Sequence, residues 1–430
     1  MENFLFEKKY SSNFRIEDVK ALSEAIAKRA SVELIGMKRV GINNFLRFFL
    51  MNRKQFLLSK GNENLFILVD LNDLIERELF SFWRLTLKRL VDQVEESSLS
   101  KDIKEKISNI FLRCIQSGDF FLTFDGVKEI VSIISKNNTN ITIFFTRFDR
   151  ISEAVSLEFF HNLQSIKDAG IGKLSFVFTS FRSLSEMAPH IFDKNSLALF
   201  SKEHFIKPAN KKDSLVMFNL FLENHKVALD EKIKEEIIEL SGGHAQYLQI
   251  SSVILSEIYA NGQKLFFSGL SKLIYEDERI NLLSEELWES LNNDEKNILK
   301  DISNNKKINK EKIEKNSYLW KSGILTAKNK VFSSLFENYI KKTESGKSTQ
   351  GPEFSKKEFL LYSILEKTPN EICERETIVE FVWPEYKEYG VSDWSIDRLV
   401  ARVRNKLKKQ KNGYEILTIR TRGYKLITAK

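Results

Sequence analysis

The sequence has 430 residues, of which 67 are Lys or Arg and 59 are Asp or Glu, giving a formal net charge of +8, and 42% are hydrophobic. This length and apolar content have room for about two to four domains with full cores. The two cysteines, Cys114 and Cys373, have no His or Cys neighbours at metal-ligand spacing, so neither a disulfide framework nor a zinc site is predicted. No apolar run approaches about 18 residues, and the start of the chain lacks the pattern of a signal peptide. We therefore expect a soluble, cytoplasmic protein without a membrane partner.

The first motif along the chain is a loop between a strand and a helix. We expect a helix over residues 15–30, a strand over 31–35 and a second helix over 45–51. Between the last two, Gly36 and Gly41 have the spacing of a phosphate-binding loop, in which backbone N–H groups and a helix N-terminus hold an anion. This order of elements predicts a nucleotide-binding architecture.

Two side chains that this chemistry normally needs are replaced. Ile42 stands where the loop lysine would meet the β- and γ-phosphates, and Asn43 stands where a Ser or Thr would bind magnesium. Lys38 and Arg39, inside the loop, would partly offset the missing lysine. The candidate nucleotide-binding residues are Gly36, Lys38, Arg39, Gly41, Asn43 and Asn44, together with Arg182 from a later part of the chain.

Further strands alternate with helices. Strands are predicted at residues 65–70, 140–149 and 173–180, with helices at 75–95, 101–116, 126–135 and 153–167. Such alternation is typical of a doubly wound α/β core whose ligand lies at the carboxyl ends of the strands. An ATPase would have an acidic pair at the end of the 140–149 run, but Thr146 and Arg147 stand there, and Asp149 is typical of a turn or cap. Arg182 follows the last strand, where a phosphate sensor would lie, although a surface arginine is the commoner case.

From residue 211 the pattern is helical, and Gly242-Gly243-His244 ends one helix and starts another. Residues 14–260 resemble the STAND-type branch of AAA-like ATPases. The resemblance implies a P-loop α/β domain over 14–205, a helical lid over 206–275 and a small winged helix over 276–340. The family usually has a proline where this chain has Ala245. Because the lysine, metal and acidic positions are all changed, we expect no ATPase activity and no certain cofactor, while ATP or ADP bound without hydrolysis stays open.

A polar linker over 341–352 precedes a segment in which positive charge is concentrated. Residues 392–430 contain 11 Lys or Arg and 3 Asp or Glu. Apolar residues that recur at three- and four-residue steps predict the buried stripe of a helix: Ile396, Leu399, Val400, Val403 and Leu407. Arg398, Arg402, Lys406 and Lys409 recur at the same steps and form a cationic face. A β-rich run with one glycine follows at 416–424 and predicts a hairpin.

Cations in this arrangement suit duplex DNA, since arginines fork onto guanine edges and lysines meet phosphates, although an isolated basic helix is more often simply solvated. Residues 353–427 resemble the winged-helix effector domain of OmpR/PhoB-type response regulators. The matching pieces are FSKKEFLLYSIL at 354–365, ERETI at 374–378, VWP at 382–384, the helix over 396–407, and TIR and GYKL between 418 and 426. Thr421 stands where the family usually has a wing glycine.

This resemblance implies a set of DNA contacts: Arg398, Arg402, Arg404, Lys406, Lys409, Thr418, Arg420 and Arg422. Arg398 and Arg402 are expected on base edges, and Arg404 either there or in an internal ion pair. The family's use of paired half-sites implies a homo-oligomer on double-stranded DNA.

We therefore expect a multidomain α/β protein with winged helices. Its predicted function is sequence-specific DNA binding by a transcriptional regulator whose STAND-like module senses a signal, self-associates or binds a protein partner. One alternative is a switch driven by ATP hydrolysis. Another is an interaction scaffold with weak, non-specific DNA binding.

Overall fold

The computed structural model describes residues 10–11, 13–57, 64–189, 191, 201–260, 267–344, 354, 356–384, 391, 393–410, 413–419 and 422–428. The chain forms two compact units. The first unit is Met1–Ile274 with Lys306–Ser334, and the second unit is Tyr275–Asn305 with Leu335–Lys430. Within the described residues, each unit contains one β-sheet.

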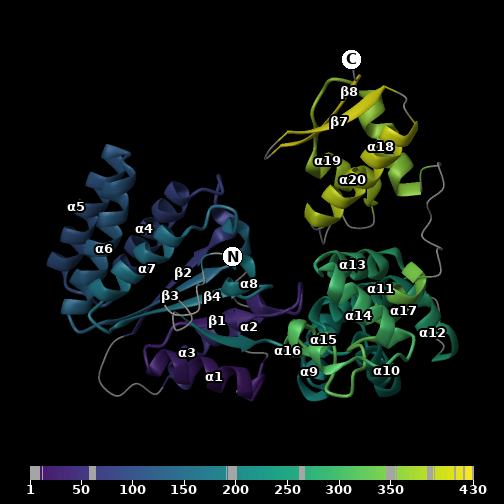
Figure 1. Ribbon diagram of the computed structural model, residues 1–430, viewed down its shortest axis with the longest axis horizontal. Helices are drawn as coiled ribbons and strands as arrows, with labels where there is room; N and C mark the ends of the chain where they lie inside the picture. Colours follow the sequence, from purple (N-terminus) through teal and green to yellow (C-terminus); the bar gives the residue numbers. More distant parts are fainter. Residues whose placement is uncertain are drawn as a thin grey trace. The chain divides into compact units, whose positions relative to one another are not determined.

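A parallel five-stranded sheet forms the middle of the first unit (Figure 1). Its strands are β1 (Val32–Ile35), β2 (Asn64–Asp70), β3 (Asn140–Thr146), β4 (Leu174–Ser180) and β5 (Lys202–Phe205), in the spatial order β2-β3-β4-β1-β5. All of these pairs are parallel, so the carboxyl ends of the strands lie along one edge. β3 and β4 are buried at every residue, as the continuous apolar runs of a sheet covered on both faces require. The predicted doubly wound α/β core is confirmed.

Helices cover both faces of this sheet. They are α1 (Ile16–Ala27), α2 (Ile42–Met51), α3 (Arg53–Phe56), α4 (Leu79–Glu95), α5 (Lys101–Ser117), α6 (Phe120–Lys136), α7 (Leu157–Ala169) and α8 (Leu184–Met187). On one face, Phe145, Phe176 and Phe178 share a core with apolar residues of α4, α6 and α7. Figure 1 shows α1 and α3 on the other side of the sheet.

Several predicted boundaries are wrong because local capping decides where an element starts. α6 begins before residue 126, since Asp119 accepts a hydrogen bond from the N–H of Leu122 at 2.8 Å and caps the helix. α7 begins after residue 153, where Ser156 caps it in the same way. β3 ends at Thr146 because Arg147 has a φ of 58° and opens a short 3-10 turn. The edge strand β5 was not predicted, since its sequence, Lys-Glu-His-Phe, has no apolar run.

The helical part of the first unit follows β5. It contains α9 (Lys211–Asn224), α10 (Glu231–Ser241), α11 (Ala245–Ala260), α12 (Phe267–Glu276), α15 (Lys310–Lys315) and α16 (Tyr318–Lys321). Gly242 and Gly243 have φ values of 58° and 78° and lie between α10 and α11. A Cβ on Gly242 would lie 1.9 Å from the carbonyl oxygen of Phe332, and one on Gly243 would lie 2.0 Å from that of Ala209. The double glycine is therefore needed for close backbone packing.

The second unit ends in a winged-helix fold. The helices and strands of the whole second unit are α13 (Glu278–Glu289), α14 (Asn293–Ser303), α17 (Ser334–Glu344), α18 (Lys356–Lys367), β6 (Cys373–Glu374), α19 (Arg375–Val382), α20 (Asp393–Gln410), β7 (Tyr414–Ile419) and β8 (Gly423–Thr428). The three strands form an antiparallel sheet in the order β6-β8-β7. The stripe predicted for α20 is buried in one core with residues of α18, α19 and β8. The predicted C-terminal winged helix is confirmed.

Among the helices in the described ranges, none has the length and hydropathy needed to span a bilayer.

Candidate DNA-binding helix and phosphate loop

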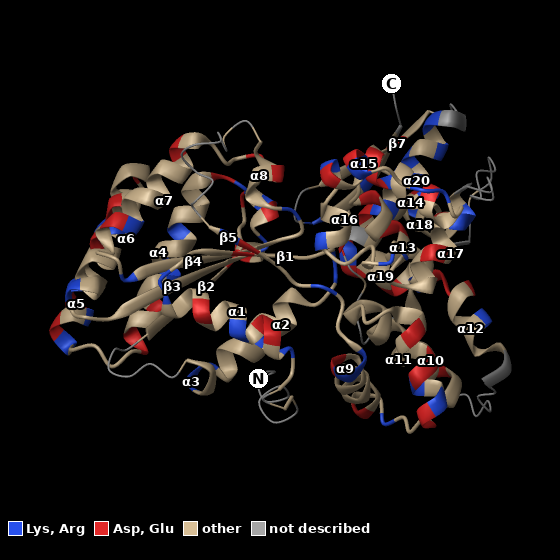
Figure 2. Ribbon diagram, turned by 60° about the horizontal axis from the view of Figure 1, so that its bottom comes forward, with Lys and Arg blue, Asp and Glu red and all other residues tan. Residues whose placement is uncertain are grey.

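α20 presents two arginines on the side opposite its buried stripe. The side chains of Arg398 and Arg402 are each 32% exposed, and they are neighbours on the helix surface because they are one turn apart. Figure 2 marks the basic residues of this helix in blue. Two forked guanidinium groups thus share the face that the sequence predicts to read bases.

Ion pairs fix the N-terminal half of α20 against α19 and β8. Arg375 of α19 donates hydrogen bonds to Asp393 at 3.1 Å and to Asp397 at 2.6 Å. The buried Tyr424 of β8 donates its hydroxyl proton to Asp397. Burial and this hydrogen bond raise the pKa of Tyr424 above its usual range, so the phenol stays protonated. These bonds therefore fix the helix that carries Arg398 and Arg402.

Arg404 connects α20 to the hairpin. Its Nε donates to the carbonyl oxygen of Ile416 at 2.7 Å, and its Nη2 donates to the hydroxyl of Thr418 at 2.8 Å. Of the two roles that the sequence left open, base reader or internal partner, the structure places Arg404 in an internal one. The partner is the β7 backbone and a hydroxyl rather than a carboxylate. Thr418, predicted as a wing contact to DNA, accepts this hydrogen bond and is exposed.

Lys406 also has an internal partner. Its Nζ lies 2.6 Å from Glu358 of α18, whose side chain is only 4% exposed, and the Lys406 side chain is 15% exposed. The Nε of Arg402 lies 3.6 Å from the same carboxylate. A buried carboxylate needs cations around it, so Lys406 supports the fold in addition to any contact with phosphate.

The remaining predicted DNA contacts differ in how much of them is described. Arg422 is exposed, as is Lys408, a further lysine of α20. The side chain of Lys409 and the whole of Arg420 lie outside the described residues. Of the predicted cationic face, Lys406 is paired within the winged helix.

The phosphate loop of the first unit joins β1 to α2. Gly41 has a φ of 106° and stands immediately before the first residue of α2. A Cβ on Gly36 would lie 2.8 Å from the carbonyl oxygen of Ile206 and 2.9 Å from a methyl carbon of Val40. The two glycines that the sequence singled out are thus required by the loop's own backbone geometry.

The position of the missing magnesium ligand is bonded to an arginine. Arg147, at the end of β3, forms an ion pair with Asp70, at the end of β2. In the orientation that its neighbours require, the amide oxygen of Asn43 accepts from Nη2 of Arg147 at 2.8 Å and from Nε at 3.2 Å. Burial opposes ionisation of Asp70, but hydrogen bonds from Arg147 and from the N–H of Asn72 outweigh it, so the pKa of Asp70 lies below its usual value. A side-chain cation therefore joins the oxygens at this edge of the sheet.

The helical part of the first unit closes on the same loop through His244. This side chain is fully buried, and its Nε2 lies 2.9 Å from the carbonyl oxygen of Lys38. Burial lowers the pKa of His244 to about 4, so the ring is neutral at pH 7 and Nε2 carries the proton it donates. The next residue, Ala245, has its Cβ 3.1 Å from the place where a Cβ on Gly41 would lie. The loop is thus packed against the start of α11.

The cations predicted to hold phosphate have other neighbours. The ammonium of Lys38 lies 5.1 Å from the centre of the Phe181 ring. The guanidinium of Arg182 lies 3.7 Å from the centre of the Tyr318 ring and also pairs with Glu186 at 3.8 Å. Arg39 is exposed, and Asn44 is half-buried at the start of α2. The structure therefore brings Asn43 and Arg147 together, while Lys38 and Arg182 each lie over an aromatic ring.

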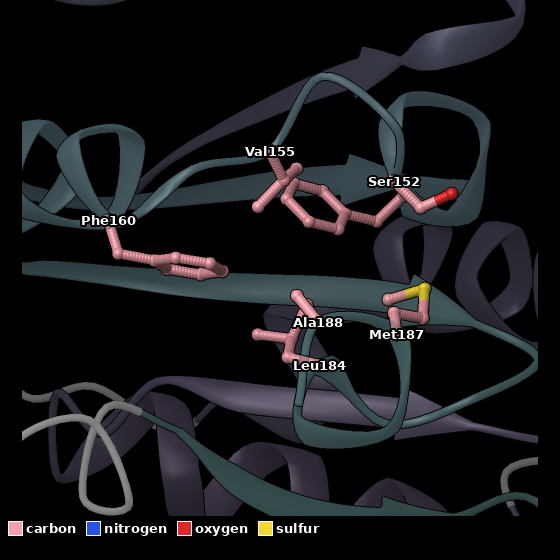
Figure 3. A pocket seen from close by; sticks show the side chains of 7 residues that line it. Ser152, Val155, Phe160, Leu184, Met187 and Ala188 are labelled. Carbon is pink, nitrogen blue, oxygen red and sulfur yellow. The ribbon is translucent and has the colours of Figure 1, made fainter. Parts of the chain in front are cut away.

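A small pocket elsewhere in the first unit is apolar. It is lined by Phe148, Ser152, Val155, Phe160, Leu184, Met187 and Ala188, as Figure 3 shows. Its volume of about 10 Å³ is of the order of a single water molecule. It has no charged group and does not suit a nucleotide.

The pairing of Arg147 with Asp70 was not predicted. In the sequence, Arg147 stands where an ATPase would have an acidic residue, and Asp70 ends the preceding predicted strand. β2 and β3 are adjacent and parallel, and Asp70 lies beside Thr146 in their register. The acidic Asp70 at the end of one strand and the basic Arg147 just after the other were the signal that could have predicted this ion pair.

The C-terminal segment matches a known family. Residues 349–426 match the family described as "Transcriptional regulatory protein, C terminal". The chain is 32% identical over 95 residues to a heme response regulator, HssR, of Staphylococcus haemolyticus, and 32% identical over 92 residues to HssR of Staphylococcus epidermidis. These segments are 22% and 21% of this chain and 40% and 39% of the two relatives. The chain thus spans about two fifths of the length of the curated relatives it matches.

Solved structures are similar in fold. A Walker-type ATPase of Pyrococcus abyssi has a TM-score of 0.50 and 18% identity, covering 76% of this chain and 95% of that chain. The ORC1 protein of Aeropyrum pernix, solved in complex with DNA, has a TM-score of 0.44 and 12% identity, covering 99% of this chain and 92% of that chain. The chain therefore carries a transcriptional regulatory C-terminal domain of the OmpR/PhoB type at residues 349–426, preceded by a P-loop fold like that of the Walker-type ATPases.

Proposed function

We propose that the chain is a transcriptional regulator that binds specific sequences in duplex DNA, with Arg398 and Arg402 on base edges. The observation that carries this proposal is the pair of neighbouring forked side chains on the face of α20 that lies opposite its core stripe. A guanidinium fork matches the two acceptors of a guanine edge in the major groove. Arg404 and Lys406 then serve mainly to position the helix.

The test is selection of binding sites from random duplex DNA by the full chain, followed by affinity measurements on the selected and a scrambled duplex. Arg402→Ala should lose about 1–3 kcal/mol of preference at one base pair and change affinity for scrambled DNA little. Arg402→Lys should show the same loss of preference, because it keeps the charge but not the fork. Lys408→Ala is the matched control and should weaken both duplexes alike. Equal weakening of both duplexes by Arg402→Ala would remove it as a base reader.

We further infer that the first unit does not hydrolyse ATP. The support is the bonding of Arg147 to both Asp70 and Asn43, which stand at a strand end and at the metal-ligand position of the loop. Magnesium is normally held by carboxylate and hydroxyl oxygens together with phosphate. A guanidinium among these oxygens neutralises their charge and competes with the metal. The role of this unit in sensing, self-association or protein binding stays a prediction.

Turnover of ATP with magnesium by the full chain should stay at the level of buffer alone. If ATP or ADP binds, its affinity should be the same in EDTA, since the site does not depend on a metal. Steady turnover that Gly41→Val abolishes would contradict this inference. Gly118→Val is the matched control, because Gly118 also has a positive φ but lies in open space after α5.

A further inference from the structure

Within the second unit, α20 contacts the acidic side of α13. The Nε of Arg398 donates to Oε1 of Glu285 at 2.9 Å, and Nη1 of Arg402 donates to Oε2 of the same carboxylate at 3.3 Å. Arg398 also lies 3.7 Å from Glu289, one turn further along α13. One carboxylate thus holds both arginines, one on each oxygen.

The environment of this contact favours pairing. The Glu285 side chain is only 13% exposed, so it is partly removed from water. Tyr339 of α17 lies in the same charged cluster, and burial together with the charges of Glu285 and Glu289 raises its pKa above the usual range. A further ion pair joins Lys357 of α18 to Glu278 of α13 at 3.5 Å. The contact is therefore more than a single surface salt bridge.

The bonded groups are the ones that DNA would need. A guanidinium N–H that donates to a carboxylate oxygen cannot donate fully to a guanine O6, a guanine N7 or a phosphate oxygen at the same time. A carboxylate pair also offers negative acceptor oxygens, which is the chemistry that a DNA strand presents. Binding of α13 and binding of DNA are thus competing uses of the same two side chains.

We propose that α13 is an autoinhibitory helix whose Glu285 and Glu289 occupy the DNA-reading arginines until DNA displaces them. This inference rests on the proposed function, in that Arg398 and Arg402 are the side chains that meet DNA. A signal that moves α13 away from α20 would then increase DNA affinity without any change in α20 itself.

The expected size of the effect follows from the ion pairs. One solvent-exposed ion pair typically changes an equilibrium constant by a factor of about 1.4 to 5. The apparent DNA affinity falls in proportion to the fraction of molecules in which α13 is away from α20. With Glu285 bridging two arginines and Glu289 adding a longer contact, we expect a decrease in DNA affinity of about tenfold.

The experiment compares the full wild-type chain with Glu285→Gln/Glu289→Gln, which keeps side-chain shape but removes both charges. The probes are the selected duplex and a scrambled duplex of the same length at one salt concentration. The double variant should bind both duplexes about tenfold more tightly. The control is Glu311→Gln/Glu314→Gln, which removes two exposed charges from α15 and should change affinity little. Unchanged affinity in the first variant, or an equal gain in both, would overturn the proposal.

A second readout does not involve DNA. In the DNA-free chain, an arginine-specific dicarbonyl reagent read by peptide mass spectrometry should modify Arg398 and Arg402 faster in Glu285→Gln/Glu289→Gln than in the wild type. The exposed Arg77 serves as the internal reference. Equal rates in the two proteins would also overturn the proposal.

Failure of this inference and failure of the proposed function give different patterns. If selection yields no sequence, the scrambled duplex and the reagent still decide whether α13 covers α20. If Arg402→Ala removes sequence preference while the glutamine variant behaves as the wild type, the proposed function stands and the autoinhibitory contact does not.

Discussion

Two of the arginine–carboxylate contacts in the molecule differ in which element supplies the carboxylate. In the first unit, Arg147 is bonded to Asp70 and Asn43, and the three residues lie in β2, in α2 and directly after β3 of one α/β core. In the second unit, Arg398 and Arg402 are bonded to Glu285, which comes from α13 and not from the winged-helix core. The chemistry is the same, but the first pairing is built into a fold and the second joins two separate elements.

This difference separates structural from functional cations. The Arg147 and Asp70 side chains are each about a third exposed, but they stand at the ends of the adjacent, paired strands β2 and β3, so they stay neighbours wherever the sheet is folded. A pair between separate helices can break while both stay folded, at the cost of a few partly exposed ion pairs. Within α20 itself the same distinction applies, because Lys406 and Arg404 are bonded inside the winged helix, whereas Arg398 is bonded to α13.

The largest effect should come from removing a cation of the structural kind. Lys406→Ala removes the cation that lies 2.6 Å from the buried Glu358 and keeps the longer contact to Arg402, and breaking a buried pair by removing one partner typically costs several kcal/mol. We expect the free energy of unfolding of the winged helix to fall by about 2–3 kcal/mol. The exposed Lys408, two positions further along α20, should cost less than about 0.5 kcal/mol when changed to Ala.

Urea unfolding of the two full-chain variants, followed by hydrogen exchange of peptides from α18 and α20, measures this difference. Equal stability of Lys406→Ala and Lys408→Ala would show that Glu358 does not need its lysine. It would also place Lys406 back among the cations available to DNA.

Much of the fold could be predicted because its signals are local and periodic. The stripe from Ile396 to Leu407 and the apolar runs of β3 and β4 are patterns that burial imposes directly on sequence. The edge strand β5 and the start of α6 could not be predicted in this way. β5 has a polar sequence and is defined by its pairing with the distant strand β1. The start of α6 depends on a single cap at Asp119.

The candidate sites were predicted by residue type but not by partner. Four cations lie together on one helix that the sequence predicts: Arg398, Arg402, Arg404 and Lys406. Their different roles depend on partners from other elements, namely Glu285, Ile416 and Glu358. A basic residue reveals its charge in the sequence, whereas the carboxylate that neutralises it is fixed only by tertiary packing. The same reason explains why Arg147 was recognised as unusual while its bond to Asp70 was not.

A somewhat smaller effect should show whether the contact between the phosphate loop and α11 is as fixed as the Arg147 contact. The folded-state pKa of His244 is about 4, below the unfolded value of about 6.5, because burial disfavours the charged ring. The stabilising contribution is therefore complete above pH 6.5 and is lost as the pH falls from 6.5 towards about 4. From pH 7 to pH 5 the free energy of opening of the loop should fall by about 2 kcal/mol, measured by hydrogen exchange of a peptide covering residues 34–46. His244→Gln should lose this pH dependence, whereas His161→Gln, a change at an exposed histidine, should keep it. If the free energy of opening of the wild-type loop, corrected for the intrinsic pH dependence of amide exchange, is the same at both pH values, the titration of His244 is not linked to opening of the loop, and its contact with Lys38 does not fix the loop.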